Sequence, residues 1–246
     1  MRVNDLCVGY TDTAILDTVS FAIEETGHLS VLGSNGSGKS TLAKALCGLL
    51  PYKGSIEIDA QELRNIPSKE RAKLISYIPA KMESFEQFTT VEDFILLGRY
   101  PYKASFKDYG AEDKKIVQET LRELSLESLG SSKLHELSSG QQQLVLIAQA
   151  LAQQSQILIF DEPTSNLDPK NTALFVQELK KVRQKHMTIL ISHDIQLAAH
   201  LDDPVLFLHD KNAVFHAKGF FETDSLSSAY GVAFQKENGV PGIAYV

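Results

Sequence analysis

Hydrophobic and polar residues alternate along the first sixty residues of the chain. The alternation has the two-residue period of β-strands that bury one face. The apolar positions fall into three groups, Val3, Leu6 and Val8, then Val19, Phe21 and Ile23, then Ile56 and Ile58. This pattern predicts a small antiparallel sheet near the start of the chain.

Three short apolar runs predict strands of a different kind. They are residues 28–32, 156–160 and 187–191. The two later runs, short and apolar or β-branched, are typical of parallel strands that helices cover on both faces, and the first run predicts a strand that leads into a glycine-rich loop. Between the last two runs, Phe175, Leu179 and Val182 recur at helical spacing and mark one face of a crossover helix. The alternation of strands and helices predicts an α/β core.

Residues 90–153 show helical patterns and no convincing strand, so we interpret them as a helical subdomain inserted into the α/β core. We place a first domain at residues 1–216, with the α/β core at about 1–80 and 154–216 and the helical subdomain at about 81–153. Residues 217–246 contain four glycines and one proline and are expected to form a loose C-terminal tail.

Composition and charge narrow the class of protein. Of 246 residues, 43% are hydrophobic, which is enough for a real core, and the formal net charge is -7. A negative net charge gives no electrostatic reason to expect binding to nucleic acid. The sequence has no apolar run long enough to span a membrane and no signal peptide at its start. We therefore expect the chain to stay in the cytosol.

The two cysteines carry no predicted chemistry. Cys7 lies in the alternating segment and Cys47 lies in an apolar helical pattern. Both are predicted to be small buried hydrophobic residues, without a disulfide.

A glycine-rich loop follows the first apolar run. Residues 33–40 read GSNGSGKS, which satisfies the pattern G-x-x-x-x-G-K-[ST] between a predicted strand and a predicted helix. Its glycines let backbone N–H groups converge on a phosphate, and the helix start adds positive partial charge. A plain glycine-serine turn is the alternative, which the complete motif argues against. The predicted nucleotide-binding residues are Gly33, Ser34, Asn35, Gly36, Ser37, Gly38, Lys39, Ser40 and Thr41.

Two acids and a histidine follow the later apolar runs. Asp161 and Glu162 end the second run and His193 follows the third. The carboxyl ends of parallel strands face the ligand crevice of an α/β sheet. There, Asp161 can hold Mg²⁺ through water and Glu162 can polarise an attacking water. A lone histidine at such a position is more often structural, but the neighbouring phosphate loop favours a functional role for His193.

These motifs, in this order, resemble the ATP-binding subunit of the ABC transporters, and the similarity extends to about residue 216. LSSGQ at residues 137–141 is similar to the family's signature LSGGQ, and SNLD at 165–168 is similar to the loop after the acid pair. The resemblance implies a P-loop NTPase fold, with a RecA-like α/β core, an N-terminal antiparallel β-subdomain and an inserted helical subdomain. It implies ATP and Mg²⁺ as cofactors, with Tyr10 stacking on adenine. It also implies catalytic roles for Glu162, His193 and Lys39, and metal binding by Ser40 and Asp161.

The resemblance further implies that two copies of the chain dimerise head to tail with two ATP molecules between them. Each site would then be completed by the signature residues Ser138, Ser139, Gly140 and Gln141 of the partner copy, and the resemblance also implies that Asp168 binds nucleotide. The uncharged signature suits a helix start that offers backbone N–H groups to a γ-phosphate. Ser138 and Gln141 also have the spacing of a capping box, which alone would be a structural role. Both roles can belong to the same residues.

The sequence departs from the family pattern at several positions. Ala80 stands where the family has a glutamine that contacts Mg²⁺ and the attacking water, Lys81 is a poor substitute, and Gln87 would need a rearranged loop. Losing such a hydrogen bond costs about 1.5 to 3 kcal/mol, or about 10- to 150-fold in rate. Ser139 replaces a glycine of the signature. Gln142, Leu144 and Gln149 stand where arginines are common. We expect slow or tightly partner-dependent hydrolysis.

Residues 94–103, FILLGRYPYK, resemble cassettes that drive uptake of metal chelates such as ferric siderophores, haem and cobalamin. The alternative is an ordinary helix end, with Gly98 as the stop and Pro101 after it. The resemblance implies docking on the cytoplasmic side of a membrane permease, with a substrate-binding protein as an indirect partner. An importer for another substrate and a regulatory cassette with weakened hydrolysis remain alternatives. A soluble ABC ATPase of DNA repair or translation would need a long coiled-coil insertion or two cassettes in one chain.

Overall fold

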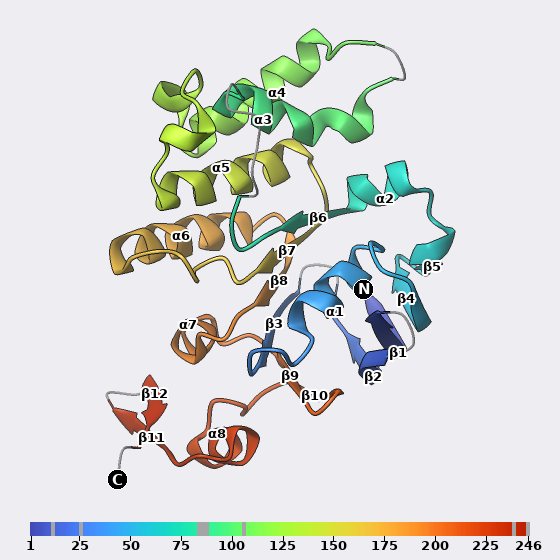
Figure 1. Ribbon diagram of the computed structural model, residues 1–246, viewed down its shortest axis with the longest axis vertical. Coiled ribbons are helices and arrows are strands. Elements are labelled where there is room, and N and C mark those ends of the chain that lie inside the picture. Colours follow the sequence, from blue (N-terminus) through green and yellow to red (C-terminus); the bar gives the residue numbers. More distant parts are fainter. Residues whose placement is uncertain (11–12, 25–26, 83–88, 105–106, 238–239, 245–246) are drawn as a thin grey trace. The chain divides into compact units, whose positions relative to one another are not determined.

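The computed structural model describes residues 1–10, 13–24, 27–82, 89–104, 107–237 and 240–244. The chain forms two compact units, labelled element by element in Figure 1. The first unit comprises Met1–Asn65 and Thr188–Val246, and the second comprises Ile66–Met187. Among the described helices, none is both long and apolar enough to cross a membrane.

The first unit begins with an antiparallel sheet of strand order β2-β1-β4-β5. Its strands are β1 (Arg2–Tyr10), β2 (Thr13–Ala22), β4 (Tyr52–Ile58) and β5 (Gln61–Glu62). All eight apolar positions of the predicted alternation are buried. The three-residue step from Val3 to Leu6 reflects a register shift at Asp5, whose φ is 46°. The predicted sheet is confirmed, and a bulge explains the break in its period.

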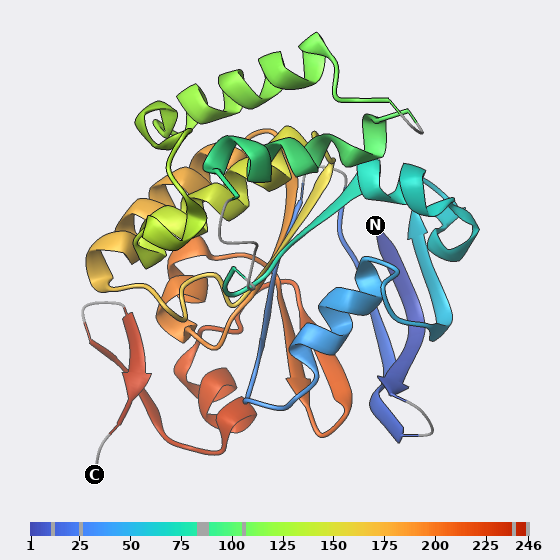
Figure 2. The same ribbon diagram turned by 45° about the horizontal axis from the view of Figure 1, so that its top comes forward.

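The same unit contains the strand that leads to the phosphate loop. That strand, β3 (His28–Gly33), lies between β8 (Met187–Ile191) and β9 (Val205–His209) and runs parallel to both. β10 (Asn212–His216) pairs antiparallel with β9. Helix α1 (Lys39–Leu46) packs against β1 and β3, and Figure 2 shows it, in light blue, between them. α7 (Ile195–Leu201) follows β8.

The two cysteines of the first unit are both free. Cys47 is buried, as predicted, but Cys7 is only half buried. Leu6 and Val8 on either side of Cys7 point into the core, so the pleat places the thiol on the opposite face. The prediction of a buried residue is wrong for Cys7.

The second unit pairs two parallel strands and contains the helical segment. β6 (Ile75–Ile78) pairs with β7 (Ile157–Asp161) in parallel. The helices are α2 (Ser68–Leu74), α3 (Val91–Leu96), α4 (Ala111–Glu123), α5 (Ser139–Ala152) and α6 (Pro169–Val182), with 3₁₀ turns η2 (Leu97–Tyr102), η3 (Glu127–Leu129) and η4 (Leu134–Glu136). α5 packs against α3, α4 and α6, so most of its faces are covered. Helices and parallel strands confirm the mixed α/β fold with a helical part.

The C-terminal segment differs from the loose tail that was predicted. It forms α8 (Thr223–Tyr230) and a hairpin of β11 (Phe234–Glu237) with β12 (Val240–Ile243). Phe220, Leu226 and Phe234 are buried in one cluster with Leu32, Ala198, Val205 and Phe207, which we call the apolar tail cluster. Its three tail members are separated by polar residues and glycines, so no local periodicity indicates them. The predicted boundary near residue 216 stays a prediction.

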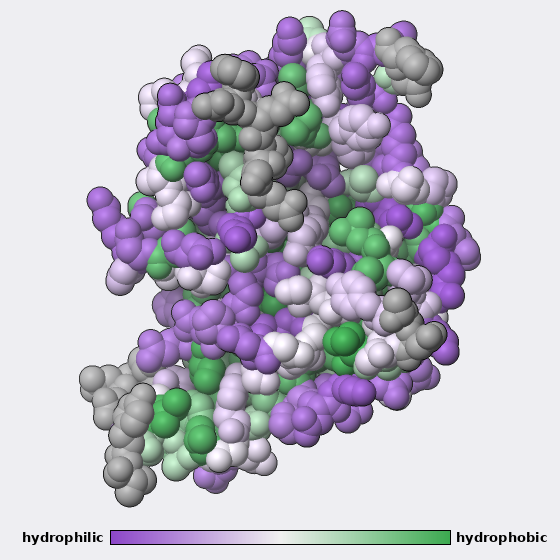
Figure 3. Space-filling view, in the orientation of Figure 1, coloured by the Kyte–Doolittle hydropathy of each residue, from purple (hydrophilic) through white to green (hydrophobic). Residues whose placement is uncertain are grey.

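The tail also leaves some apolar surface. Val232 and Ile243 are 44% and 45% exposed, and Figure 3 shows hydrophobic surface over α8 and the hairpin. The Tyr230 hydroxyl is buried and has no hydrogen-bond partner within the described part of the chain. Burial raises the pKa of Tyr230 to about 12.

Candidate functional site

The phosphate loop (residues 33–40) connects β3 to α1, as the motif requires. Gly36 and Gly38 have φ values of 82° and 97°, which favour glycine. A Cβ at Gly33 would lie 2.6 Å from the carbonyl oxygen of Leu208. The two fixed glycines of the motif, Gly33 and Gly38, and Gly36 between them therefore meet physical requirements of this backbone.

Lys39 is directed back onto the loop that precedes it. Its Nζ donates to the carbonyl oxygens of Gly33 (3.0 Å) and Ser34 (3.1 Å), and the residue is 6% exposed. The ammonium group thus lies over the concave side of the loop, where it can also meet a phosphate. Ser34, Asn35, Gly36 and Ser40 are exposed around it, while Thr41 is buried.

The start of α1 fits an anion. Its N-cap residue is Gly38, which has no side chain to accept from the first-turn N–H groups, and the structure shows no side-chain cap there. The first turn contains no acidic residue. A helix start without an internal acceptor suits a phosphate, because the N–H groups and the helix dipole both favour negative charge.

Two further predicted residues belong to the first unit. Tyr10 ends β1 and is 47% exposed, so its ring is accessible for stacking. His193 is exposed in the short connection between β8 and α7. Its neighbours fix that connection, because the Asp194 N–H donates to Ser192 Oγ (2.9 Å) and Asp194 Oδ1 caps α7 at Leu197 N (2.9 Å).

The acid pair ends β7 in the second unit. Asp161 is 4% exposed, and its Oδ2 accepts a hydrogen bond from the hydroxyl of Tyr77 on β6 at 2.7 Å. A hydrogen bond to a buried carboxylate fixes its orientation. Sequence reasoning missed Tyr77, because only the pairing of β6 with β7 brings it to Asp161.

Glu162 has an unusual backbone for its residue type. Its φ is 50°, in the left-handed region, and its carbonyl oxygen accepts from the Ser165 N–H (3.2 Å) and Ser165 Oγ (3.0 Å). Non-glycine residues in this region are uncommon and concentrate at functional sites. The backbone therefore turns at Glu162, directly after β7 ends at Asp161.

The carboxylate chemistry fits Mg²⁺, an ion that prefers oxygen ligands and few protein groups. Among the described residues, no three His, Cys, Asp or Glu side chains are grouped to hold a metal ion. A magnesium ion at Asp161 would therefore rely on oxygens from a bound nucleotide and water.

Ala80 follows β6 by two residues and is half buried. Its carbonyl oxygen accepts from Asn166 Nδ2 at 3.3 Å, which ties it to the loop after the acid pair. Lys81 is exposed, and Gln87 lies outside the described residues. The side chain at residue 80 is a methyl group, which offers neither a metal ligand nor a hydrogen bond.

The signature (residues 137–141) starts α5 as a capping box. Ser138 Oγ accepts from the Gln141 N–H (3.3 Å), and Gln141 Oε1 accepts from the Ser138 N–H (2.9 Å). The predicted capping box is confirmed. Gln142 adds support, because its Nε2 donates to the carbonyl oxygens of Leu134 and Leu137, each at 3.3 Å.

Asp168 caps the next helix. Its Oδ1 accepts from the Asn171 N–H (2.8 Å) and its Oδ2 accepts from Asn171 Nδ2 (2.9 Å) at the start of α6. Sequence reasoning did not single out Asn171, although an N-cap aspartate three residues before an asparagine is a local pattern.

The FILLGRYPYK segment is not a helix end at Gly98. α3 ends at Leu96 and passes into η2, which includes Gly98, and a Cβ there would clash with the Gln149 carbonyl oxygen of α5. Arg99 is 4% exposed and donates to Asp113 Oδ1 (3.1 Å), the Ala152 carbonyl oxygen (2.8 Å) and Gln154 Oε1 (2.9 Å). The glycine and arginine of this segment thus hold η2 against α5.

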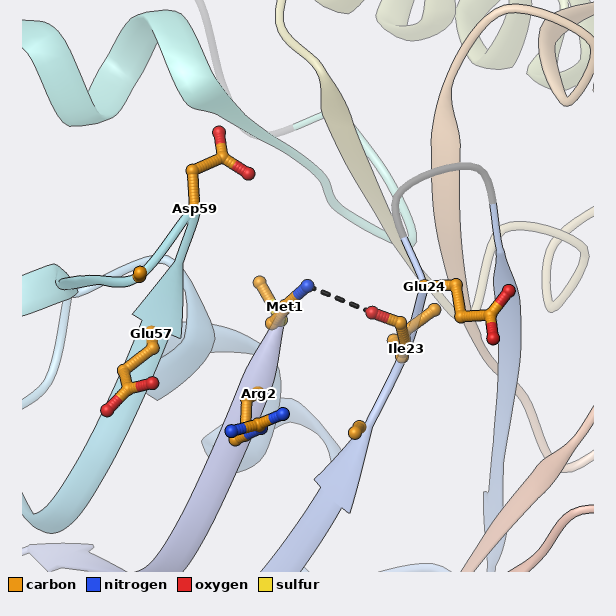
Figure 4. Close-up of a pocket in the computed structure, with 8 residues that line it drawn as sticks. Met1, Arg2, Ile23, Glu24, Glu57 and Asp59 are labelled. Atoms are coloured by element: carbon orange, nitrogen blue, oxygen red, sulfur yellow. Dashed lines mark hydrogen bonds between the residues drawn. The ribbon is translucent and has the colours of Figure 1, made fainter.

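One pocket of the first unit contains none of the predicted nucleotide-binding residues. It lies between strand ends of the antiparallel sheet and includes the chain's first residue, whose amino group donates to the Ile23 carbonyl oxygen at 3.0 Å (Figure 4). Arg2, Glu24, Glu57 and Asp59 also line it.

The predicted residues therefore occupy both units. The phosphate loop, Tyr10 and His193 belong to the first, whereas the acid pair, Ala80, the signature and Asp168 belong to the second. Within the second unit, strand pairing and loop contacts join Asp161 to Tyr77 and Ala80 to Asn166.

Curated relatives resemble the chain over most of its length. A Helicobacter pylori protein described as an iron chelatin transport ATP-binding protein is 38% identical over 221 residues, covering 88% of this chain and 86% of that protein. The manganese transport system ATP-binding protein MntB of Listeria innocua is 35% identical over 240 residues, covering 95% and 97%.

Solved structures are similar as well. An inward-facing ABC transporter described as of the metal-chelate type superposes with a TM-score of 0.83 at 25% identity, covering 100% of this chain and 96% of that chain. A dimeric ATP-binding cassette in a post-hydrolysis state with ADP and Pi gives a TM-score of 0.72 at 27% identity, covering 89% and 99%. The family model of the ABC transporters matches residues 16–165. The chain thus belongs to the ABC transporter family, as one of its ATPases.

Proposed function

We propose that this chain is the ATP-hydrolysing subunit of an importer for a metal chelate, such as a ferric siderophore, haem or cobalamin. The observation that carries the substrate class is the 38% identity to a protein described as an iron chelatin transport ATP-binding protein. The resemblance of residues 94–103 to chelate-importer cassettes agrees with it. Within the chain, that segment packs η2 onto α5.

In this proposal the first unit binds the nucleotide. The loop N–H groups of residues 33–38 and the start of α1 hold the phosphates, and Lys39 moves its ammonium onto the outer phosphates. Tyr10 stacks on the adenine ring. His193, at the end of β8, contacts the γ-phosphate and senses its loss.

The second unit supplies the acids. Asp161, through water, and Ser40 of the first unit would hold Mg²⁺, which would neutralise the charge that develops on the phosphates. Glu162 accepts a proton from the attacking water, and its left-handed backbone sets the direction of its carboxylate. Tyr77 keeps the second oxygen of Asp161 occupied, so that the first is directed at the metal's water shell.

The ATP site is completed by a second copy of the chain. Ser138, Ser139, Gly140 and Gln141 of the partner copy present the start of α5 to the γ-phosphate, and Asp168 of that copy lies nearby. The similarity to a dimeric cassette with ADP and Pi supports this arrangement. The capping box keeps the helix start in shape without adding a charge.

The cassette pair then drives a membrane permease from its cytoplasmic side, and a substrate-binding protein delivers the chelate to the other side. Hydrolysis is slow or strongly dependent on the permease, because Ala80 offers neither a metal ligand nor a hydrogen bond to the water.

The test of the proposal is uptake by the assembled transporter. The chain is purified from its native membrane with the permease that accompanies it, and both are reconstituted into vesicles with the binding protein. We expect ATP-dependent uptake of an iron-labelled chelate. The Lys39→Ala variant abolishes uptake, whereas Lys44→Ala, on the last turn of the same helix, preserves it. Uptake that persists in Lys39→Ala, or a purification without any permease, contradicts the proposal.

Manganese import is the second candidate, because the 35% identical Listeria innocua relative is a manganese transport protein. The same vesicles distinguish the two substrates. Uptake of free Mn²⁺ without uptake of any chelate favours this candidate and leaves the ATPase assignment intact.

A further inference from the structure

Two adjacent residues of the signature differ in their surroundings. Ser139 is exposed, whereas Gly140 is buried. The subunit therefore tolerates a side chain at Ser139, where the family has glycine. The burial of Gly140 raises the question of what lies against it.

The amide of Asn171 fills the space where a side chain at Gly140 would be. A Cβ built on Gly140 would lie 2.9 Å from Asn171 Nδ2 and still closer to its Oδ1 and Cγ. Real Cβ atoms do not approach other atoms this closely, so a side chain at residue 140 would displace the amide or the helix. Gly140 does not have a left-handed backbone, so packing and not conformation requires the glycine.

Asn171 is not free to move aside. Asp168 accepts from both its backbone N–H (2.8 Å) and its Nδ2 (2.9 Å). These two bonds orient the amide plane and leave Oδ1 directed at Gly140. The amide is therefore held between the cap of α6 and the first turn of α5.

We propose that Asn171 is a positioning residue that fixes the signature end of α5 against the Asp168 loop of the same subunit. The inference rests on the proposed ATP-bound dimer, in which both segments face the partner copy. The Asn171 amide contacts both Gly140 and Asp168, so it keeps the signature and Asp168 at a fixed spacing. Both segments would then contact the partner's nucleotide together. Gly140 is the residue whose small size permits this contact.

A different explanation of Gly140 is that the partner's nucleotide needs the space. The two explanations predict opposite results for a double variant. If Asn171 occupies the space, removing its side chain makes room for a methyl group at residue 140. If the partner's nucleotide occupies it, Gly140→Ala is harmful whether or not Asn171 is present.

The experiment measures ATP-driven dimerisation by light scattering in the Glu162→Gln background, where the dimer should persist. We expect Gly140→Ala to raise the ATP concentration for half-maximal dimerisation about tenfold or more. Asn171→Ala should raise it less, because the spacing loosens without a clash. The double variant Gly140→Ala/Asn171→Ala should stay within about threefold of Asn171→Ala alone. Lys170→Ala, exposed on the same turn of α6, is the matched control and should change nothing.

Binding of a fluorescent ATP analogue to the monomer separates positioning from misfolding. The phosphate loop belongs to the other unit, so monomer affinity should be unchanged in all four variants. If Glu162→Gln itself fails to dimerise with ATP, the proposed dimer is wrong. If it dimerises, and the double variant is as impaired as Gly140→Ala, the positioning role of Asn171 is wrong while the dimer stands.

Discussion

At the scale of single residues, Ala80 is the difference from the family pattern that is expected to change the rate of ATP hydrolysis most. The structure ties its carbonyl oxygen to Asn166 but gives it no polar side chain. The backbone of this position is therefore held in place, and in the proposed function the group that would contact metal and water is missing. A glutamine restored here would extend from a backbone that is already anchored.

Ala80→Gln should raise the ATPase rate of the assembled transporter. The expected gain is about 10- to 150-fold, from a hydrogen bond of about 1.5 to 3 kcal/mol that is made mainly in the transition state. Steady-state phosphate release at saturating ATP measures it. Lys81→Gln, one residue further on and exposed, is the control. An unchanged rate in Ala80→Gln means that Ala80 does not limit hydrolysis.

Single residues were predicted well wherever a local motif carries the chemistry. Gly33 and Gly38 are the fixed glycines of the motif and meet needs of the backbone, and the capping box follows from the spacing of Ser138 and Gln141. Tyr77 and Asn171 were not predicted. Tyr77 contacts Asp161 on another strand, and Asn171 contacts Gly140 on another helix. No spacing along the sequence indicates such contacts.

At the scale of elements, the pairing of β6 with β7 builds part of the candidate metal site. Tyr77 lies opposite Ile159 in the strand register, two residues before Asp161. Its hydroxyl reaches the carboxylate at the end of the neighbouring strand. The strand pair thus fixes the direction of a buried acid before any nucleotide binds.

Tyr77→Phe removes this hydrogen bond and preserves the ring. We expect metal affinity at the ATP site to fall about 10-fold, because such supporting hydrogen bonds tune metal ligands by about 10- to 100-fold. Binding of Mn²⁺ in the presence of ATP, followed by electron paramagnetic resonance, measures the affinity without turnover. ATP affinity without metal should stay the same. Equal Mn²⁺ affinities in the variant and the parent protein would show that Tyr77 does not position Asp161.

Strong periodicity made most elements predictable. A burial period of two residues predicts the antiparallel sheet, and a period of about 3.6 residues predicts the apolar face of α6. Short, fully buried apolar runs predict β7 and β8. The tail was misjudged for the opposite reason. Phe220, Leu226 and Phe234 each contribute one buried side chain between glycines and polar residues, so they form no period and become a cluster only in three dimensions.

At the scale of the whole molecule, no single unit contains a complete set of catalytic residues. The phosphate loop and His193 belong to one unit and the acid pair to the other. The proposed dimer adds a further division, since the signature acts on the nucleotide of the partner copy. Hydrolysis therefore depends on assembly as much as on chemistry.

Glu162→Gln should stabilise the dimer of two copies with ATP bound. Without the base, ATP binds and is not hydrolysed, so the dimer should accumulate with two nucleotides per pair. Light scattering and nucleotide content after gel filtration report both quantities. Glu178→Gln, half buried on α6, is the control and should release ATP like the parent. A Glu162→Gln variant that stays monomeric at saturating ATP contradicts the head-to-tail dimer.

The apolar tail cluster has a consequence for any shortened form of the protein. Leu32, which precedes Gly33 in β3, is buried in one cluster with Phe220, Leu226 and Phe234 of the C-terminal segment. A chain cut after residue 216 would uncover Leu32 and the ring of Phe207 together. Such a fragment would keep every nucleotide-binding motif and yet expose an aromatic patch beside the phosphate loop, which favours aggregation over ATP turnover.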